Sequence, residues 1–196
     1  MNRCALLSTL LVALAGCATP APVERARTAP DPEPANGGIA WFVRDDYLAQ
    51  YAAWRDGLVV AGPRGGPVKL WFTREANGRW TGPGQYGLTV ELAVEGSRIT
   101  GPTVDITFTR VEGGFRLAGL WFRENVDLTV DGKGARAQHL RFVRDPDGAY
   151  VSTDSPGQAI VLIGDAARLD DPPWPELPLA ALLSGWGVKN RNGPRM

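Results

Sequence analysis

The sequence predicts an all-β domain, in which an antiparallel meander of about eight to ten strands forms a barrel-like or strongly curved sheet. Three observations support this fold class. Short runs of Val, Leu, Phe and Thr are separated by turns rich in glycine, of which the chain has 24. Within the runs, apolar and polar residues alternate, as in a strand with one buried face. The third observation is an internal repeat.

The repeat appears when the sequence is compared with itself. Residues 90–96 recur as residues 126–132, at an offset of 36. A Phe-x-Arg segment occurs three times, and each copy ends shortly before a turn pair that tolerates positive φ: Asn77-Gly78, Gly113-Gly114 and Asp147-Gly148. We interpret this as two good copies and one decayed copy of a unit of about four short strands.

Each predicted strand has one face suited to burial. Within the three Phe-x-Arg segments, alternate residues share a face, namely Leu70, Phe72 and Arg74, then Val104, Ile106, Phe108 and Arg110, then Leu140, Phe142 and Arg144. One buried and one wet face is typical of antiparallel sheets. A meander of such strands between Val68 and Ile163 removes its exposed edges most simply by curling into a barrel.

Two helical stretches are expected to flank the sheet. Arg44 to Arg55 places Tyr47, Tyr51 and Trp54 near one helix face, which predicts a short N-terminal helix. Near the end, residues 177–183 form a short apolar helix or buried segment that two glycines terminate. Residues 189–196 form a basic tail.

Composition and motifs exclude several classes of function. The 21 Asp and Glu residues balance the 21 Lys and Arg residues, which argues against nucleic-acid binding. The single histidine, His139, is expected to lie exposed on a strand without an accompanying nucleophile motif. Sequence signatures of metalloproteases, serine hydrolases and phosphate loops are missing. We therefore predict no catalytic residue, no metal site and no cofactor, and favour a binding protein over an enzyme.

The N-terminus has the order of an export signal. Arg3 precedes an apolar run at residues 5–15 that is too short to span a bilayer. Leu14-Ala15-Gly16-Cys17 resembles the lipobox of bacterial lipoproteins, where lipoprotein signal peptidase cleaves before an acylated cysteine. The resemblance implies a signal peptide at residues 1–16 and a lipid anchor on Cys17. Ala18 after the cysteine implies sorting to the outer membrane, with the protein facing the periplasm or the cell surface.

The segment after the anchor is expected to be a tether. Residues 17–38 comprise the anchor and a Pro-rich stretch with few large apolar groups, which cannot offset the entropy of ordering. At about 3.1 Å per residue, such a stretch reaches roughly 65 Å from the membrane. The folded domain is then predicted at residues 39–188, which suits one β-rich domain.

Two groups of side chains are candidates for a binding surface. Arg74, Arg110 and Arg144 occupy equivalent strand ends, and three converging guanidinium groups would bind phosphate or carboxylate. The alternative is that each covers apolar rim with its stem. Trp71 and Trp121 lie between apolar neighbours and are expected to point away from the main core. The alternative for them is packing beneath the predicted N-terminal helix.

These features favour an outer-membrane lipoprotein whose barrel-like domain binds or scaffolds a partner protein, a glycan or a hydrophobic ligand. In one version of this hypothesis, the barrel carries a hydrophobic ligand in a cavity. A second hypothesis is an envelope hydrolase acting on peptidoglycan or polysaccharide, which requires two converging carboxylates or His139 with a serine. A third is a structural assembly subunit with a large exposed apolar patch.

Overall fold

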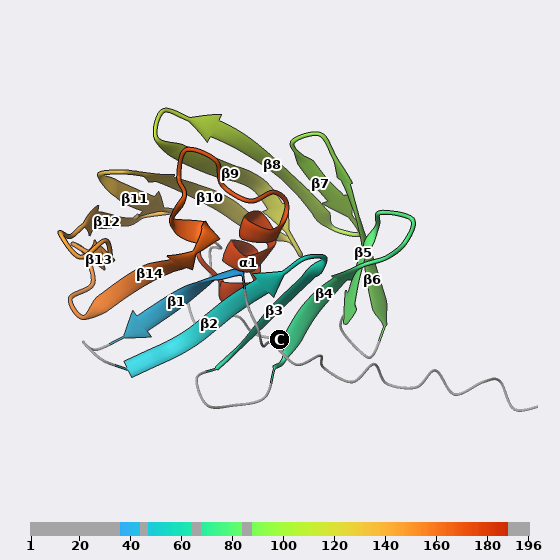
Figure 1. Cartoon of the computed structure of the whole chain (residues 1–196), viewed down its shortest axis with the longest axis horizontal. Coiled ribbons are helices and arrows are strands. Elements are labelled where there is room, and N and C mark those ends of the chain that lie inside the picture. The colour runs from blue at the N-terminus through green and yellow to red at the C-terminus, as the bar shows by residue number, and fades with distance from the viewer. Residues whose placement is uncertain (1–35, 44–46, 64–67, 84–87, 188–196) are drawn as a thin grey trace, which may run out of the picture.

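The computed structural model describes residues 36–43, 47–63, 68–83 and 88–187. They form fourteen strands, a 3-10 helix and one α-helix (Figure 1). The strands are β1 (Gly37–Val43), β2 (Tyr47–Arg55), β3 (Leu58–Pro63), β4 (Leu70–Arg74), β5 (Trp80–Pro83), β6 (Thr89–Glu95), β7 (Arg98–Gly101), β8 (Val104–Val111), β9 (Gly114–Trp121), β10 (Glu124–Asp131), β11 (Gly134–Ala137), β12 (Leu140–Arg144), β13 (Tyr150–Ser152) and β14 (Gln158–Gly164). The helices are η2 (Asp165–Ala167) and α1 (Glu176–Ser184).

The sheet is a closed antiparallel barrel, which confirms the predicted all-β, barrel-like meander. Each strand pairs with its neighbours in the chain, and β1 also pairs with β14 from Gly37↔Gly164 to Val43↔Gln158, which closes the ring. The prediction of about eight to ten strands was too low. Several strands have only three or four residues, too short for alternation to reveal them, and β1–β3 fall outside the predicted meander.

The predicted N-terminal helix from Arg44 to Arg55 is wrong. Residues 47–55 form β2, which pairs with β1 on one side and β3 on the other. Its inward residues Ala52 and Trp54 are buried, whereas Tyr51 and Ala53, which alternate with them, are partly exposed. The aromatic spacing fits a helix as well as a strand, but Tyr and Trp favour strands, and pairing on both sides satisfies the backbone.

Helix α1 lies in the barrel and fills its centre (Figure 1). Every residue from Leu177 to Ser184 is buried, and the helix packs mainly against β1, β2 and β3. A helix that is apolar on all sides is expected in a protein core. It ends at Gly185, whose left-handed backbone directs its N–H to the carbonyl oxygen of Leu182. The prediction of a short apolar helix or buried segment at residues 177–183 is therefore confirmed, but the helix lies inside the barrel and does not flank the sheet as expected.

Strand direction defines two ends of the barrel. Because all neighbours are antiparallel, every even-numbered strand ends at the same end, which we call the entry rim. Strand β1 begins at this rim, and the chain leaves β14 there, where the Asp165 N–H donates to the carbonyl oxygen of Asn36 over 3.2 Å. The segment from η2 to Pro175 then crosses the rim and leads into α1.

The three Phe-x-Arg segments, which match in sequence, lie on strands that end at the same rim of the barrel. They lie at or next to the ends of β4, β8 and β12, and one glycine of each turn pair has a positive φ, at 81° for Gly78, 66° for Gly113 and 90° for Gly148. The internal repeat itself stays a prediction from sequence comparison. Helix α1, at nine residues, is far shorter than a bilayer requires, and no helix among the described residues is long and apolar enough to span a membrane.

Candidate functional site

The three predicted arginines lie at one rim but do not form one site. Arg74 and Arg144 are the last residues of β4 and β12, and Arg110 is next to last in β8, so all three lie at the entry rim. Three strands lie between β4 and β8 and three between β8 and β12, and no hydrogen bond among the described residues joins any two of the arginines. Arg74 is exposed, whereas the Arg144 guanidinium lies 5.9 Å from the centre of the Tyr150 ring. Burial raises the pKa of the Tyr150 hydroxyl, which donates to the Asp131 carbonyl oxygen over 3.0 Å.

Arg110 instead contributes to a recess between β8 and the segment that crosses the rim. This rim recess has a volume of about 360 Å³ and is lined by Arg110, Asp165, Arg168 and residues 171–174. Arg110 Nη2 lies 2.8 Å from Asp171 Oδ1, and Arg168 Nη2 lies 3.3 Å from Asp165 Oδ1. Both arginines are therefore already neutralised by carboxylates, so the recess has little net charge to offer an anion.

Packing holds the crossing segment in place. Ala166 and Leu169 are buried in the core, and the Trp174 ring lies 4.8 Å from the Phe108 ring, centre to centre. The Asp171 side chain is nevertheless 83% exposed, and its carboxylate is paired with Arg110. The rim recess is thus a polar depression with two ion pairs and one indole wall.

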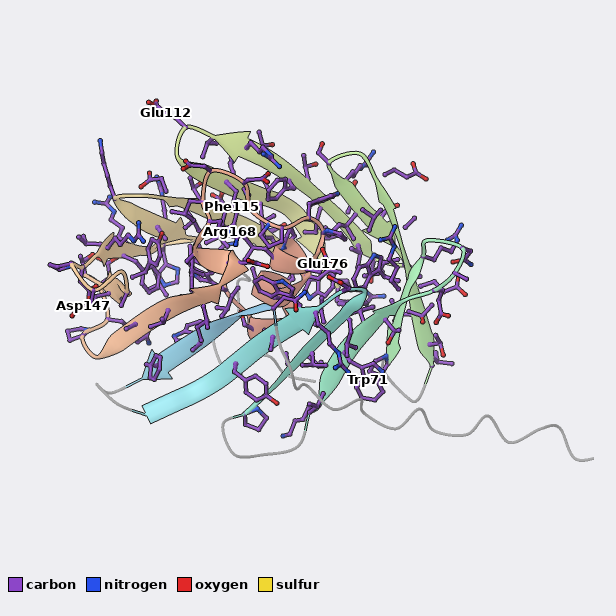
Figure 2. All side chains as sticks on the ribbon, viewed as in Figure 1. Trp71, Glu112, Phe115, Asp147, Arg168 and Glu176 are labelled. Atoms are coloured by element: carbon purple, nitrogen blue, oxygen red, sulfur yellow. The ribbon has the colours of Figure 1, made fainter. Side chains whose placement is uncertain are left out.

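The two predicted tryptophans face opposite sides of the sheet. Trp71 is partly exposed and lies on the outer side of β4, away from α1 (Figure 2). The expectation that Trp121 points away from the core is wrong, because it is 7% exposed and packs edge-on against Phe72 at 6.1 Å. Alternation along β9 from Phe115 and Leu117 directs Trp121 inward, whereas its neighbour Phe122 lies in the following turn and is 37% exposed.

The remaining candidates are His139, a metal site, the Cys17 anchor with its tether, and the basic tail. His139 is exposed in the turn between β11 and β12, not on a strand. No group of three or more Asp, Glu, His or Cys side chains within the described residues is arranged to hold a metal ion. Cys17, the tether at residues 17–38 as far as residue 35, and the basic tail at residues 189–196 lie outside the described residues.

The outer wall of the barrel carries a second recess, with a different character. This arginine groove spans β10, β11 and β12, has a volume of about 500 Å³, and is lined by Lys133, Arg136 and Arg141 among others. One carboxylate also lines it, that of Asp131, whose Oδ1 accepts the backbone N–H groups of Lys133 and Gly134 at 2.7 and 2.9 Å. The groove therefore has more cationic than anionic side chains.

The strand register places the guanidinium groups of the arginine groove in one row. Arg136 and Arg141 are direct partners across β11 and β12, and both are exposed on the outer face. The same row of register partners continues through Thr129 on β10 to Arg116 on β9 and Thr109 on β8. With neighbouring strands about 4.8 Å apart, the row presents a donor side chain at each step across five strands.

Two of the three guanidinium groups in this row are unpaired. Arg116 Nη2 lies 3.4 Å from Asp127 Oδ1, but the side chains of Arg136 and Arg141 have no ion-pair or hydrogen-bond partner among the described residues. Like charges directly opposite each other destabilise a sheet, and a bound anion between them would relieve the repulsion. This arrangement favours a ligand with carboxylate, phosphate or sulfate groups.

Sequence reasoning missed the arginine groove, although a signal was available. Arg136 and Arg141 are equidistant from the turn at Gln138 and His139, which places them opposite each other in any hairpin closed there. The turn lacks a glycine and uses a positive φ of 55° at Gln138, so its position was not evident. No family model, curated protein or solved structure matches the chain, and the site is therefore defined by its geometry.

Proposed function

We propose that this protein is a lipoprotein of the outer membrane, whose β-barrel is a non-catalytic domain that binds an anionic polymer of the cell envelope, such as a charged glycan. The observation that carries the proposal is the opposed, unpaired pair Arg136 and Arg141 in the arginine groove. The lipobox resemblance at residues 14–17 supports the location. The row of Arg and Thr side chains suits an extended ligand that crosses the strands.

The filled interior favours binding on the outside of the barrel. Helix α1 occupies the centre, and its residues Leu177 to Ser184 are buried against the barrel wall. A carrier of hydrophobic ligands needs an enclosed apolar cavity, and the two recesses described above instead lie at the rim and on the outer wall. In the rim recess, the two carboxylates open to a hydrolase are those of Asp165 and Asp171, and each is paired with an arginine.

The binding proposal is tested with fluorescently labelled polygalacturonate, a carboxylate polymer, and neutral dextran as its uncharged counterpart. We expect the protein to bind the first and not the second. Loss of a charge-assisted hydrogen bond costs about 1.5–3 kcal/mol, so Arg136→Gln and Arg141→Gln should each weaken binding about 10- to 100-fold. Arg98→Gln is the matched control, because that guanidinium is already held by Asp105 at 2.6 Å.

Two results would contradict the binding proposal. Equal affinity for both polymers, or equal losses in all three variants, would show that the arginine groove does not recognise anions. Added salt should weaken binding of the anionic polymer, because exposed charges are screened.

Anchoring is tested separately. With Cys17→Ser, labelled palmitate should no longer be incorporated and the protein should leave the membrane fraction. Replacement of Cys4 by serine is the control, because the lipobox resemblance implies that this residue is removed with the signal peptide. Retention of the label after Cys17→Ser would contradict the assignment of the anchor.

A further inference from the structure

The outer wall of the barrel is divided into a charged side and an uncharged side. On the charged side, strands β6–β10 carry outward ion pairs, which include Arg98 with Asp105 and Arg116 with Asp127. Strands β13, β14, β1 and β3 contain no charged residue, and β2 and β4 each have one arginine, at the last position. These six strands are consecutive around the barrel and lie side by side, although Ala40 on β1 and Val60 on β3, which alternation also directs outward, are buried.

The outward residues of this uncharged face are mainly apolar or aromatic. Their inward neighbours, such as Ile160, Ile39 and Phe72, belong to the core, so alternation directs the intervening residues outward. Ile163 is 51% exposed and Val151 is 39% exposed, while several larger side chains are partly exposed. The uncharged face is defined here by Phe42, Tyr51, Trp71, Val151, Val161 and Ile163.

We propose that the uncharged face docks on the surface of a phospholipid bilayer, which rests on the lipid anchor of the proposed function. The path of the chain supports a bilayer as the partner of this face. Residues 18–36 join Cys17 to the first residue of β1, and β1 lies within the uncharged face, with β13 and β14 on one side and β2–β4 on the other. A membrane that holds Cys17 is therefore within reach of this face.

The chemistry of the face also suits a bilayer. Trp and Tyr concentrate where apolar and aqueous phases meet, and Trp71 and Tyr51 are partly exposed on this face. Membrane docking through apolar residues adds a second contact to an acyl anchor. The arginine groove lies on the neighbouring strands β10–β12, beside the face, and so remains open to a ligand when the face is docked.

The test uses the full chain, purified from membranes and returned to vesicles of phosphatidylethanolamine and phosphatidylglycerol. An environment-sensitive fluorophore is placed on Val151→Cys, in the uncharged face, or on Val111→Cys, on β8. The two valines are 39% and 36% exposed and differ chiefly in which side of the barrel they occupy. We expect a blue shift and stronger emission on vesicle binding for the first position only.

A second measurement follows Trp71 itself. Brominated lipids should quench part of the tryptophan emission of the vesicle-bound protein, and Trp71→Phe should remove that quenching. Docking is overturned if the protein is bound to vesicles and both fluorophores respond equally, or if Trp71→Phe leaves the quenching unchanged. A blue shift at Val151→Cys without vesicles also overturns it, because a second copy of the chain then covers the face.

Failure of the anchor gives a different result. Under the proposed function the thiol of Cys17 is acylated, so the parent chain should take up no fluorophore. A parent chain that is labelled, or that does not remain with the vesicles, overturns the anchor and this inference together.

Discussion

Arg136 and Arg141 face each other across β11 and β12 as direct register partners, and both guanidinium groups extend into the same groove on the outer wall. A sheet normally avoids this arrangement, because like charges at opposed positions repel. The nearest comparable guanidinium in the row, that of Arg116, is paired with Asp127. The two opposed arginines, neither of which has a carboxylate partner among the described residues, therefore lower the stability of the fold locally. An anionic ligand would offset this effect.

Removal of one member of this pair should stabilise the ligand-free protein. For Arg141→Gln we expect the free energy of unfolding to rise by about 0.2–1 kcal/mol, because a cross-strand repulsion is lost. Chemical denaturation measures the change. Arg98→Gln, which removes a paired arginine, should give no such gain. A lower stability of Arg141→Gln without ligand would show that the guanidinium makes a favourable contact instead.

The helix inside the barrel should contribute strongly to stability. Leu179 on α1 is fully buried, and truncation of a buried leucine typically costs about 2–5 kcal/mol through lost burial and the cavity left behind. Leu179→Ala should therefore lower the free energy of unfolding by that amount in a denaturant titration. Leu88→Ala is the control, because Leu88 is 67% exposed. Similar small effects of both substitutions would contradict a helix packed in the core.

The start of β9 should not tolerate a side chain. A Cβ on Gly114 would overlap the carbonyl oxygen of Val130 on β10, so Gly114→Ala must displace backbone. Overpacking of this kind costs about 1–3 kcal/mol, which a thermal unfolding curve would detect. Gly132→Ala, in the turn after β10, should be close to neutral because nothing lies within 4 Å of the new atom. The β9–β10 register would be in doubt if both variants behaved alike.

The ion pair on the charged side should respond to pH. A hydrogen bond from Arg98 and its positive charge lower the pKa of Asp105. Since the folded pKa lies below the unfolded value, the pair stabilises the fold above the unfolded pKa of about 3.9, and this contribution is lost as pH falls through the folded pKa. We expect the effect on stability to be small, because both side chains are exposed.

An NMR titration that follows the side-chain carboxyl carbon of Asp105 measures its pKa directly. Arg98→Gln should raise the pKa of Asp105 towards its ordinary value, and Arg116→Gln should leave it unchanged. An Asp105 midpoint that does not respond to Arg98→Gln would mean that the pair does not persist in solution.

Local patterns were sufficient to predict much of the fold. Alternation at residues 104–110 and 126–130, with turn glycines between the strands, indicated half-buried antiparallel strands before their pairing was known. The uniform apolarity of residues 177–183 indicated a buried segment, and the structure shows it as α1. Trp121 was assigned to the wrong face because its apolar neighbours were weighed more heavily than the alternation set by Phe115 and Leu117.

The sequence by itself determined the all-β class, the position of the three rim arginines near strand ends and the apolar C-terminal segment, because each of these depends on side chains near one another in the chain. Tertiary structure decided that residues 47–55 are a strand, since β2 forms only by pairing with β1 and β3. It also decided which strands share the uncharged face, because closure by β1 and β14 brings together segments more than 100 residues apart. Such pairing is non-local, and its free energy depends on partners that local periodicity does not reveal.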